Sequence, residues 1–406
     1  MTPSETFFNL LRSPAPAGVA AADAQKSPPD PPAAGSQIPT GNPSAQRWPV
    51  LALAPMQDVT TLEFWRVMAR YGGPDVYWTE FFRVHGNSRP EKWILDSITQ
   101  NPTGRPVVAQ LIGNDIPALV RTAGELQRYP VAAIELNLGC PAPVVYRKCA
   151  GGGLLRELGK VDAILGALRD AVPIPFTVKT RIGFESPAEF DALLPIFAKH
   201  PIDLLTVHAR TVKQMYRPGV RYDLIARAAR ELRCPVLANG NVHGAAQAQA
   251  VLAKTGARGL MIGRGGIRNP WLFDQIRAQL RGEKLKLTSG RDVLAYVREL
   301  WESEITPACV AEAGVPTSLP DSPTAGNQIL TGNTSARRRP GVKESAQVER
   351  MKKFMNFIGE GVGEQFLHDI RRVATTADFF RVCEDYLNHN EPLTLEPDAP
   401  PGDKLP

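Results

Sequence analysis

The sequence predicts an α/β protein: a (β/α)8 TIM barrel followed by a small C-terminal helical domain. Eight short apolar runs rich in β-branched residues alternate with amphipathic stretches of helical period between about residues 50 and 265. Nearly every run ends in a polar side chain, as the active face of a barrel requires. After Gly282 the pattern changes to longer amphipathic stretches at 292–305 and 348–387, which indicate helices packed on one another.

The eight runs follow one another at a regular interval. In order they are PVLALAP, DVYWTE, PVVAQL, AAIELN, FTVKTR, LLTVHAR, PVLANGN and GLMIGRG. Helix candidates such as 115–129 and 245–254 separate them. The spacing is near 30 residues except after the fourth run, where it is about 43. We therefore expect an enlarged loop, starting NLGCPAP at Asn137, on the active face.

Composition bounds the class of protein. The chain has 406 residues, 43% hydrophobic and 22% charged, which suits a large globular protein and excludes wholesale disorder. No apolar run approaches the roughly 18 residues of a membrane helix, and the start has no signal-peptide pattern, so we expect a cytoplasmic protein without membrane contact. Five cysteines without zinc spacing predict no metal site. The formal net charge of +6 permits a polyanionic partner without identifying one.

Two stretches rich in Pro, Ala, Gly, Ser and Thr, at 13–47 and 311–341, differ from the rest of the chain. They share a duplicated element, since GSQIPTGNPSAQR matches GNQILTGNTSARR at nine of thirteen positions. Such segments bury too little apolar surface to fold. The expected organisation is, in chain order, a disordered segment at 1–47, a catalytic barrel at 48–283, a helical domain at 284–391 interrupted by a low-complexity insert at 311–343, and a flexible tail at 392–406.

Polar residues at the strand ends suggest a cofactor site. Lys179 and His208 lie in otherwise apolar strands, where an unpaired charge is costly. The glycine-containing ends of the last two runs, ANGN and IGRG, are where barrels commonly hold phosphate, although two ordinary turns would look the same. A flavin ring crossing the mouth would need a cation near N1, for which Lys179 is suited, with Gln110 and the Met56 backbone at its edge. His208 alone is equally well explained as a core histidine.

Cys140 is the candidate proton donor. It lies in Gly139-Cys140-Pro141 on the enlarged loop, just before the glycine-rich stretch 150–153. A thiol with a pKa of about 8.5 stays largely protonated at neutral pH, which favours proton donation over nucleophilic attack.

These motifs together resemble the tRNA-dihydrouridine synthases. The resemblance is carried, in order, by LAPMQDVT, TEFFRVHG, AQL, ELNLGCPAPVVYRKCAGGGLL, VKTRIG, VHART, ANGN and MIGRG. It runs from about residue 50 to 282 and continues more weakly through 348–387. The GCP motif with its downstream glycines is specific to this family, whereas the proline-rich inserts are not part of its pattern.

The resemblance implies FMN-dependent reduction of specific tRNA uridines to 5,6-dihydrouridine, with NADPH as reductant. It implies that Cys140 donates a proton to uracil C5 while hydride passes from flavin N5 to C6. The implied FMN-binding residues are Pro55, Met56, Gln110, Lys179, His208, Asn239, Gly240, Asn241, Gly263 and Arg264. Asn137 and Arg210 are implied to lie beside the target uridine.

The helical segment corresponds by resemblance to a tRNA-binding domain. Between Glu344 and Glu391 it has six Lys or Arg against nine Asp or Glu, so phosphate contacts would need local clusters such as 352–353 or 371–372. We expect a monomer with tRNA as its partner and no stable protein partner. Two alternatives remain: an FMN enzyme for a free pyrimidine-like molecule, which the helical domain disfavours, and a non-catalytic tRNA-binding protein, which Cys140, Lys179 and His208 together disfavour.

Overall fold

The computed structural model describes residues 1–12, 48–305 and 344–397. The chain divides into two compact units, one of Met1–Lys286 with Leu395–Pro406 and one of Leu287–Thr394. The insert expected at 311–343, and Cys309, lie outside the described residues.

The first unit alternates strands and helices. Its strands are β1 (Val50–Leu53), β2 (Tyr77–Trp78), β3 (Phe82–Val84), β4 (Val107–Gly113), β5 (Ala133–Leu138), β6 (Phe176–Arg181), β7 (Leu204–His208), β8 (Val236–Asn239) and β9 (Gly259–Ile262). Its helices are α1 (Pro3–Arg12), α2 (Leu62–Met68), α3 (Lys92–Thr99), α4 (Ile116–Leu126), α5 (Pro143–Tyr146), α6 (Leu158–Ala171), α7 (Phe190–Lys199), α8 (Tyr222–Glu231), α9 (Ala245–Thr255), α10 (Arg264–Arg268) and α11 (Leu272–Leu280).

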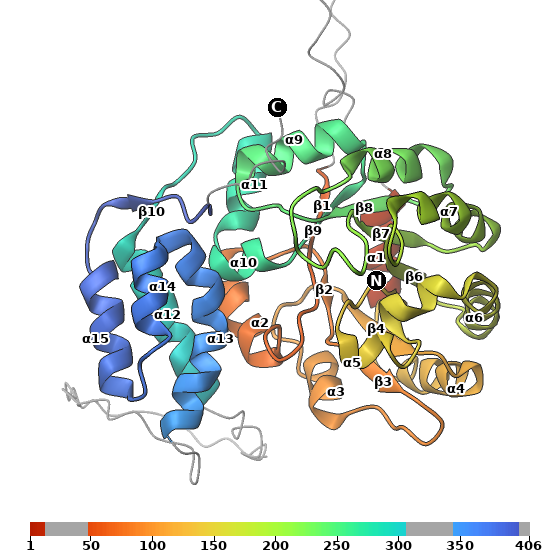
Figure 1. The fold of residues 1–406 in the computed structure, drawn as a ribbon, viewed down its shortest axis with the longest axis horizontal. Helices are drawn as coiled ribbons and strands as arrows, with labels where there is room; N and C mark the ends of the chain where they lie inside the picture. Colours follow the sequence, from red (N-terminus) through yellow and green to blue (C-terminus); the bar gives the residue numbers. More distant parts are fainter. Residues whose placement is uncertain (13–47, 306–343, 398–406) are drawn as a thin grey trace, which may run out of the picture. The chain divides into compact units, whose positions relative to one another are not determined.

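The strands form one parallel sheet that closes into a barrel. Their order is β1-β9-β8-β7-β6-β5-β4-β2, and a parallel bridge between Ala52 and Val76 joins its two ends. At that seam the Leu53 amide donates to the Val76 carbonyl at 3.3 Å. Helices surround the strands in Figure 1. The predicted TIM barrel and all eight strand positions are therefore confirmed, with apolar strands buried on both faces as parallel strands must be.

The second predicted strand is split. Both β2 and β3 pair with β4, and residues 79–81 separate them. The Thr79 amide still donates to the Val108 carbonyl at 3.0 Å. The Thr79 hydroxyl accepts the Gln110 amide at 3.1 Å, in the place of a backbone carbonyl. The apolar pattern of the sequence could not show that a side-chain oxygen replaces a backbone acceptor at this point of the sheet.

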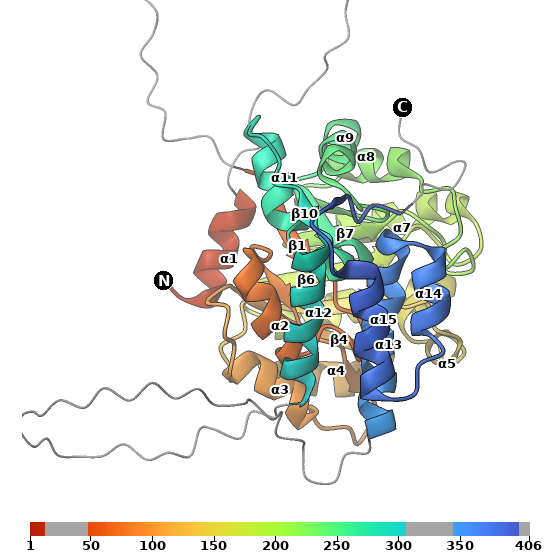
Figure 2. The same ribbon diagram turned by 90° about the vertical axis from the view of Figure 1, so that its left-hand side faces the viewer.

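The expectation of disorder over 1–47 is wrong for the first twelve residues. Helix α1 places Phe7 and Leu11, one turn apart, in a core cluster with inward-facing residues from most of the strands. The Phe7 ring meets Trp78 edge-on, with ring centroids 6.4 Å apart. Figure 2 shows α1, in red, at one end of the barrel. The composition of the following 35 residues masked this short amphipathic pattern in the sequence.

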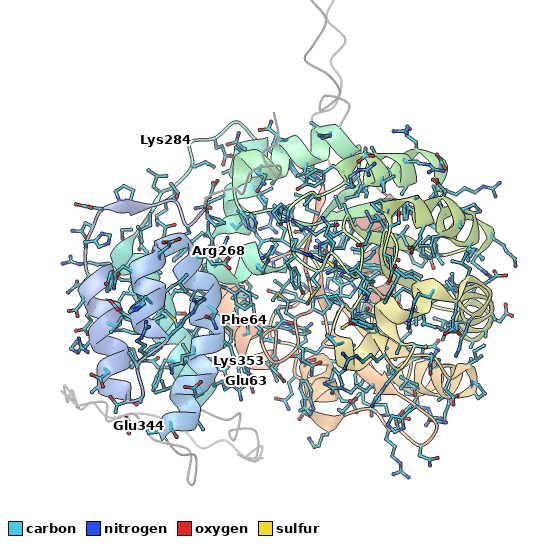
Figure 3. The ribbon with its side chains drawn as sticks, in the orientation of Figure 1. Glu63, Phe64, Arg268, Lys284, Glu344 and Lys353 are labelled. Carbon is cyan, nitrogen blue, oxygen red and sulfur yellow. The ribbon has the colours of Figure 1, made fainter. Side chains whose placement is uncertain are left out.

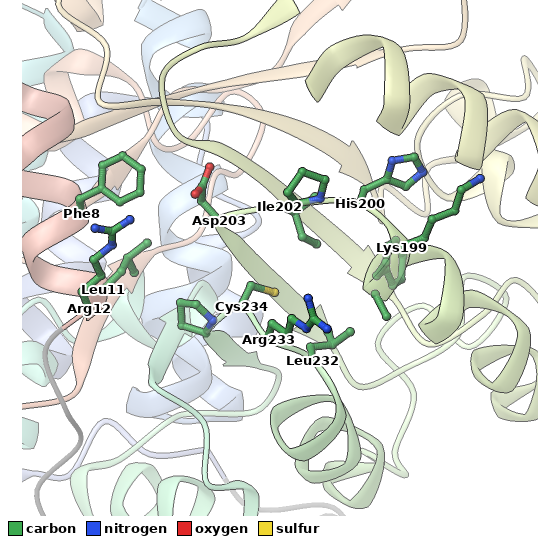
Figure 4. A pocket seen from close by; sticks show the side chains of 14 residues that line it. Phe8, Leu11, Arg12, Lys199, His200, Ile202, Asp203, Leu232, Arg233 and Cys234 are labelled. Carbon is green, nitrogen blue, oxygen red and sulfur yellow. The ribbon is translucent and has the colours of Figure 1, made fainter. Parts of the chain in front are cut away.

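Arg258 fastens this helix to the barrel. Its guanidinium donates to the carbonyl oxygens of Leu10, Leu11 and Trp48. It thus provides hydrogen-bond donors for the free carbonyls of the last turn of α1 and for the residue two positions before β1. A pocket of about 410 Å³ lies beside α1, lined also by Asp203 and Cys234 just before β7 and β8 (Figure 4). These residues mark the amino-terminal end of the barrel.

The second unit is helical, as predicted. It contains α12 (Gly290–Ile305), α13 (Glu344–Val362), α14 (Glu364–Ile370) and α15 (Thr376–Leu387), with β10 (Thr288–Ser289) antiparallel to β11 (Pro392–Leu393). Trp301 of α12 packs against Phe379 and Phe380 of α15, each with ring centroids 5.1 Å away. These aromatic contacts join helices that are distant in the sequence.

The expectation of a flexible tail from residue 392 is wrong for residues 392–395. Pro392 and Leu393 pair with β10, and the side chain of Leu395 is fully buried. Within the described ranges, no helix has the length and apolarity needed to cross a bilayer.

Replacing Phe7 with Ala tests whether α1 is part of the barrel core. Deleting a fully buried Phe side chain should lower the free energy of unfolding by about 3–5 kcal/mol. Urea unfolding followed by tryptophan fluorescence measures this change. Phe8→Ala is the matched control, because Phe8 is only partly buried and should cost clearly less. Equal, small effects of both variants would contradict the packing of α1.

Candidate active site

The residues predicted to form a site converge at the carboxyl ends of the barrel strands. Gln110, Asn137, Lys179 and His208 come from four successive strands, β4 to β7. Asn137 lies opposite Lys179 in the β5–β6 pair, and His208 opposite Asn239 in the β7–β8 pair. The remaining predicted residues follow strand ends: Pro55 and Met56 after β1, Cys140 after β5, Arg210 after β7, Gly240 and Asn241 after β8, and Gly263 and Arg264 after β9.

A chain of hydrogen bonds links the barrel interior to the cysteine loop. Glu135 Oε2 accepts from Gln110 Nε2 at 2.5 Å, and Gln110 Oε1 accepts from Asn137 Nδ2 at 2.8 Å. Asn137 Oδ1 then accepts from the amides of Gly139 and Cys140, both at 2.9 Å. Both ends of the Asn137 carboxamide are therefore engaged within the protein, and its contact with a uridine stays a prediction.

Cys140 is half-buried and closely packed. The Gly152 amide donates to the Cys140 carbonyl at 3.1 Å. Gly151 has a φ of +54°, and a Cβ there would lie 3.0 Å from the Cys140 Cβ, so this close approach requires glycine. Burial raises the pKa of the Cys140 thiol, and nearby positive charges, Lys179 foremost, oppose this only in part. The thiol therefore carries its proton at neutral pH, as a proton donor must.

Arg181 is a buried residue beside the candidate site that the sequence reasoning did not single out. Its side chain is 1% exposed and donates to the carbonyls of Gly139 at 2.9 Å, Thr211 at 2.8 Å and Met215 at 2.7 Å. It thus ties the loop after β5 to the loop after β7. Burial lowers its pKa to about 10, which leaves it charged at neutral pH. The only signal in the sequence was a second cation in the strand FTVKTR.

Lys179 and Glu135 form an electrostatic couple inside the barrel. Burial lowers the pKa of Lys179 to about 8, while the Glu135 charge opposes that change. Burial raises the pKa of Glu135 to about 7, and the Gln110 hydrogen bond and the Lys179 charge oppose it. Lys179 is therefore mostly cationic at pH 7, and its contact with a flavin stays a prediction.

His208 presents a buried nitrogen to the site. It is 7% exposed, and its Nε2 has no hydrogen-bond partner among the residues that the structure describes. Burial and the charges of Arg181 and Lys179 lower its pKa well below the ordinary value, so the ring is neutral. A buried unpartnered polar atom costs free energy unless a ligand satisfies it, which favours a cofactor contact over a satisfied core histidine.

The ends of β8 and β9 meet beside an exposed aromatic ring. Arg264 Nη2 donates to Asn241 Oδ1 at 3.3 Å, and its guanidinium carbon lies 5.1 Å from the Tyr216 ring centroid. The Arg181 guanidinium lies 5.6 Å from the same ring. Tyr216, half exposed on the loop after β7, was not predicted as a site residue. Gly240, with a φ of +131°, allows the turn that brings Asn241 here.

Three of the predicted site residues have polar groups that are hydrogen-bonded within the protein. The Met56 amide, expected at a flavin edge, donates to Thr60 Oγ1 at 2.8 Å, so that backbone donor is already occupied. Asn239 Nδ2 donates to the Met261 carbonyl at 2.7 Å and ties β8 to β9. Arg210 Nε donates to the Arg217 carbonyl at 2.6 Å. Their contacts with cofactor or substrate stay predictions.

A second buried carboxylate, Glu80, follows β2. Its Oε2 accepts from the Asp58 amide at 2.9 Å and supports the turn after β1, where Asp58 has a φ of +57°. Its Oε1 is buried without a hydrogen-bond partner in the described part of the chain. Burial raises its pKa to about 7.

Arg268 of α10, labelled in Figure 3, is fully buried with its Nη1 3.2 Å from His243 Nδ1.

Comparison with known proteins decides the family. The family model described as dihydrouridine synthase matches residues 52–302. The chain belongs to the dihydrouridine synthase family. The resemblance seen in the sequence motifs is thus confirmed, and so is the prediction that the protein is an enzyme of this family.

Three curated relatives are named tRNA-dihydrouridine(16) synthase. The protein from Neisseria meningitidis serogroup A is 32% identical, over 63% of this chain and 79% of its own length. The protein from Pseudomonas putida is 33% identical, over 62% and 80% respectively. The protein from Ralstonia nicotianae is 35% identical, over 57% and 73%.

The pH dependence of Cys140 alkylation tests the protonated thiol. Because burial raises its pKa, the midpoint of the rate of reaction with iodoacetamide should lie above that of a cysteine-containing peptide, whose pKa is about 8.5. Mass spectrometry of the peptide containing Cys140 follows the rate from about pH 6 to 10. Comparing midpoints removes the effect of limited access on the absolute rate. A midpoint below that of the reference peptide would show a stabilised thiolate and contradict the assignment.

Proposed function

We propose that this protein reduces uridine to 5,6-dihydrouridine in tRNA with bound FMN and with NADPH as reductant. The observation that carries the proposal is the position of Cys140 on a loop that Asn137 and Arg181 hold at the barrel mouth, where burial raises the pKa of the thiol. A proton donor held near the Lys179 cation and the unpartnered His208 nitrogen suits reduction of a polarised double bond.

The residues at the mouth fit FMN. The unpartnered His208 Nε2 and the Lys179 cation would face the ring and ribityl parts, while Arg264 and Asn241 would face the phosphate. Gly240 and Gly263 would allow close approach of backbone groups. When bound, FMN supplies the hydride for uracil C6.

Cys140 Sγ gives its proton to uracil C5, which completes the addition of two hydrogens across the C5–C6 bond. The resulting thiolate recovers a proton from solvent. Arg181 and Asn137 keep the loop in place during this transfer, because each bonds the Gly139–Cys140 segment from a different strand. Lys179 remains mostly charged at pH 7 and would stabilise negative charge on the ring system.

We place the target at position 16 of tRNA. The names of the three relatives support this choice.

The helical unit would supply further tRNA contacts. The basic residues considered in the sequence make local contacts there: Lys352 pairs with Glu349 at 2.6 Å, Arg371 Nε donates to Asn356 at 2.8 Å, and Arg372 donates to the His368 carbonyl at 3.0 Å. Phosphate binding there would have to compete with these bonds.

Nucleoside mass spectrometry of tRNA tests the reaction. Purified protein with FMN and NADPH should restore dihydrouridine to tRNA from cells lacking this gene. Cys140→Ala should bind flavin and tRNA normally and lose about 100- to 10,000-fold in rate, as removal of a general acid does. No dihydrouridine with a yellow protein would favour a small-molecule flavin enzyme, and none with a colourless protein a binding module.

A tRNA in which U16 is replaced by C tests the position. The site-specific dihydrouridine signal should vanish with this substrate, while the control tRNA with U17 or U20 replaced by C should react at a comparable rate. Reverse-transcription mapping after alkaline treatment locates the modified nucleotide. Continued modification of the U16→C substrate would refute the assignment of position 16 but not the reaction.

A further inference from the structure

Glu135 is a buried ionisable side chain that the proposed reaction does not use. It is 0% exposed, in the middle of β5, two residues before Asn137 and on the same inward face. Its neighbours come from the adjacent strands: Gln110 of β4 at 2.5 Å, and Thr177 of β6, whose hydroxyl donates to Glu135 Oε1 at 3.2 Å. Lys179 of β6 supplies the opposing charge.

The contacts of Glu135 have a fixed direction. Both oxygens of Glu135 accept, Oε2 from Gln110 and Oε1 from Thr177, which is the arrangement of an ionised carboxylate, and the Lys179 charge favours that form. A carboxylate only accepts hydrogen bonds, whereas a carboxamide donates at one end and accepts at the other. Glu135 therefore requires Gln110 to present Nε2, which leaves Gln110 Oε1 to accept from Asn137. Asn137 must then present Oδ1 to the amides of Gly139 and Cys140.

Reversal of this direction would break the loop contact. If the Gln110 amide turned over, Asn137 would have to turn as well, and its NH2 group would face two backbone N–H donors. Both hydrogen bonds to the cysteine loop would then be lost, each with a buried donor left unsatisfied. No bond along the chain can reverse alone.

We propose that Glu135 is a positioning residue whose carboxylate sets the orientation of the Gln110 and Asn137 amides and thereby holds the loop that carries Cys140. The catalytic consequence rests on the proposed role of Cys140, but the positioning itself does not. Lys179 compensates the charge that this acceptor-only group brings into the barrel, since an unpaired carboxylate there would be strongly disfavoured.

Hydrogen–deuterium exchange of the full-length protein tests this assignment. In Glu135→Gln, the isosteric side chain no longer enforces the direction, so the Gly139 and Cys140 amides should exchange about 10- to 100-fold faster. This range corresponds to loss of one or two net hydrogen bonds, at about 1.4 kcal/mol per tenfold. Thr177→Val is the matched control, because it removes the hydrogen bond to Glu135 Oε1 and leaves the Gln110 contact untouched. Exchange of the Gly139 and Cys140 amides in this control should stay within about threefold of the wild type.

A double substitution tests whether the loop contact can be rescued. Glu135→Gln combined with Gln110→Glu places the acceptor-only group one step along the chain, where it still accepts from Asn137. Protection of the Gly139 and Cys140 amides should return to within about threefold of the wild type. General damage to the barrel would not be repaired by adding a second substitution. If Glu135→Gln alone fails to fold, a folded double variant with wild-type protection supports the proposal and an unfolded one overturns it.

The outcomes separate this proposal from the proposed function. Unchanged exchange in a folded Glu135→Gln variant would overturn the positioning role, whatever its activity. Faster exchange together with at least tenfold slower dihydrouridine formation, at unchanged flavin content, would support both. Faster exchange in the variant, with no dihydrouridine formed even by the wild type, would support the positioning role and refute the reaction.

Discussion

Polar and ionisable side chains buried inside an apolar barrel are the constraint on which this site depends. Glu135, Arg181 and Gln110 are all between 0 and 1% exposed. Groups of this kind are stable away from water only when hydrogen bonds or opposite charges replace the solvent. Burial is the largest cause of the pKa changes of Glu135, Lys179, Arg181 and His208. The hydrogen bonds and opposite charges around these buried groups are therefore required for the fold, whatever part they take in the proposed reaction.

The two ends of the barrel meet this constraint differently. At the amino-terminal end, Phe7 and Leu11 of α1 close the core with apolar surface, and Arg258 satisfies the last carbonyls of that helix. At the carboxyl-terminal end the interior becomes polar, and His208 Nε2 remains without a partner in the described chain. Apolar packing therefore closes the amino-terminal end, while polar side chains gather at the carboxyl-terminal end, as expected of a barrel enzyme.

Two strands fix the cysteine loop from different sides. Asn137 at the end of β5 accepts from its amides, and Arg181 at the end of β6 donates to its Gly139 carbonyl. Arg181 also reaches the loop after β7, next to Tyr216. The loop is thus held by side chains that are themselves locked in the barrel. Such support places a reacting atom more reproducibly than a loop held only by its own backbone.

The sequence by itself determined the barrel, the strand ends and the family. Alternation of apolar runs and amphipathic stretches is a local property, so it survives in the sequence, and the GCP motif on an enlarged loop was enough to single out Cys140. It did not reveal α1, because a ten-residue helix gains its stability from the barrel end that it covers. Nor did it reveal the roles of Glu135 and Arg181. Their partners lie 25 to 42 residues away in the chain, and only closure of the sheet in its observed register brings them together.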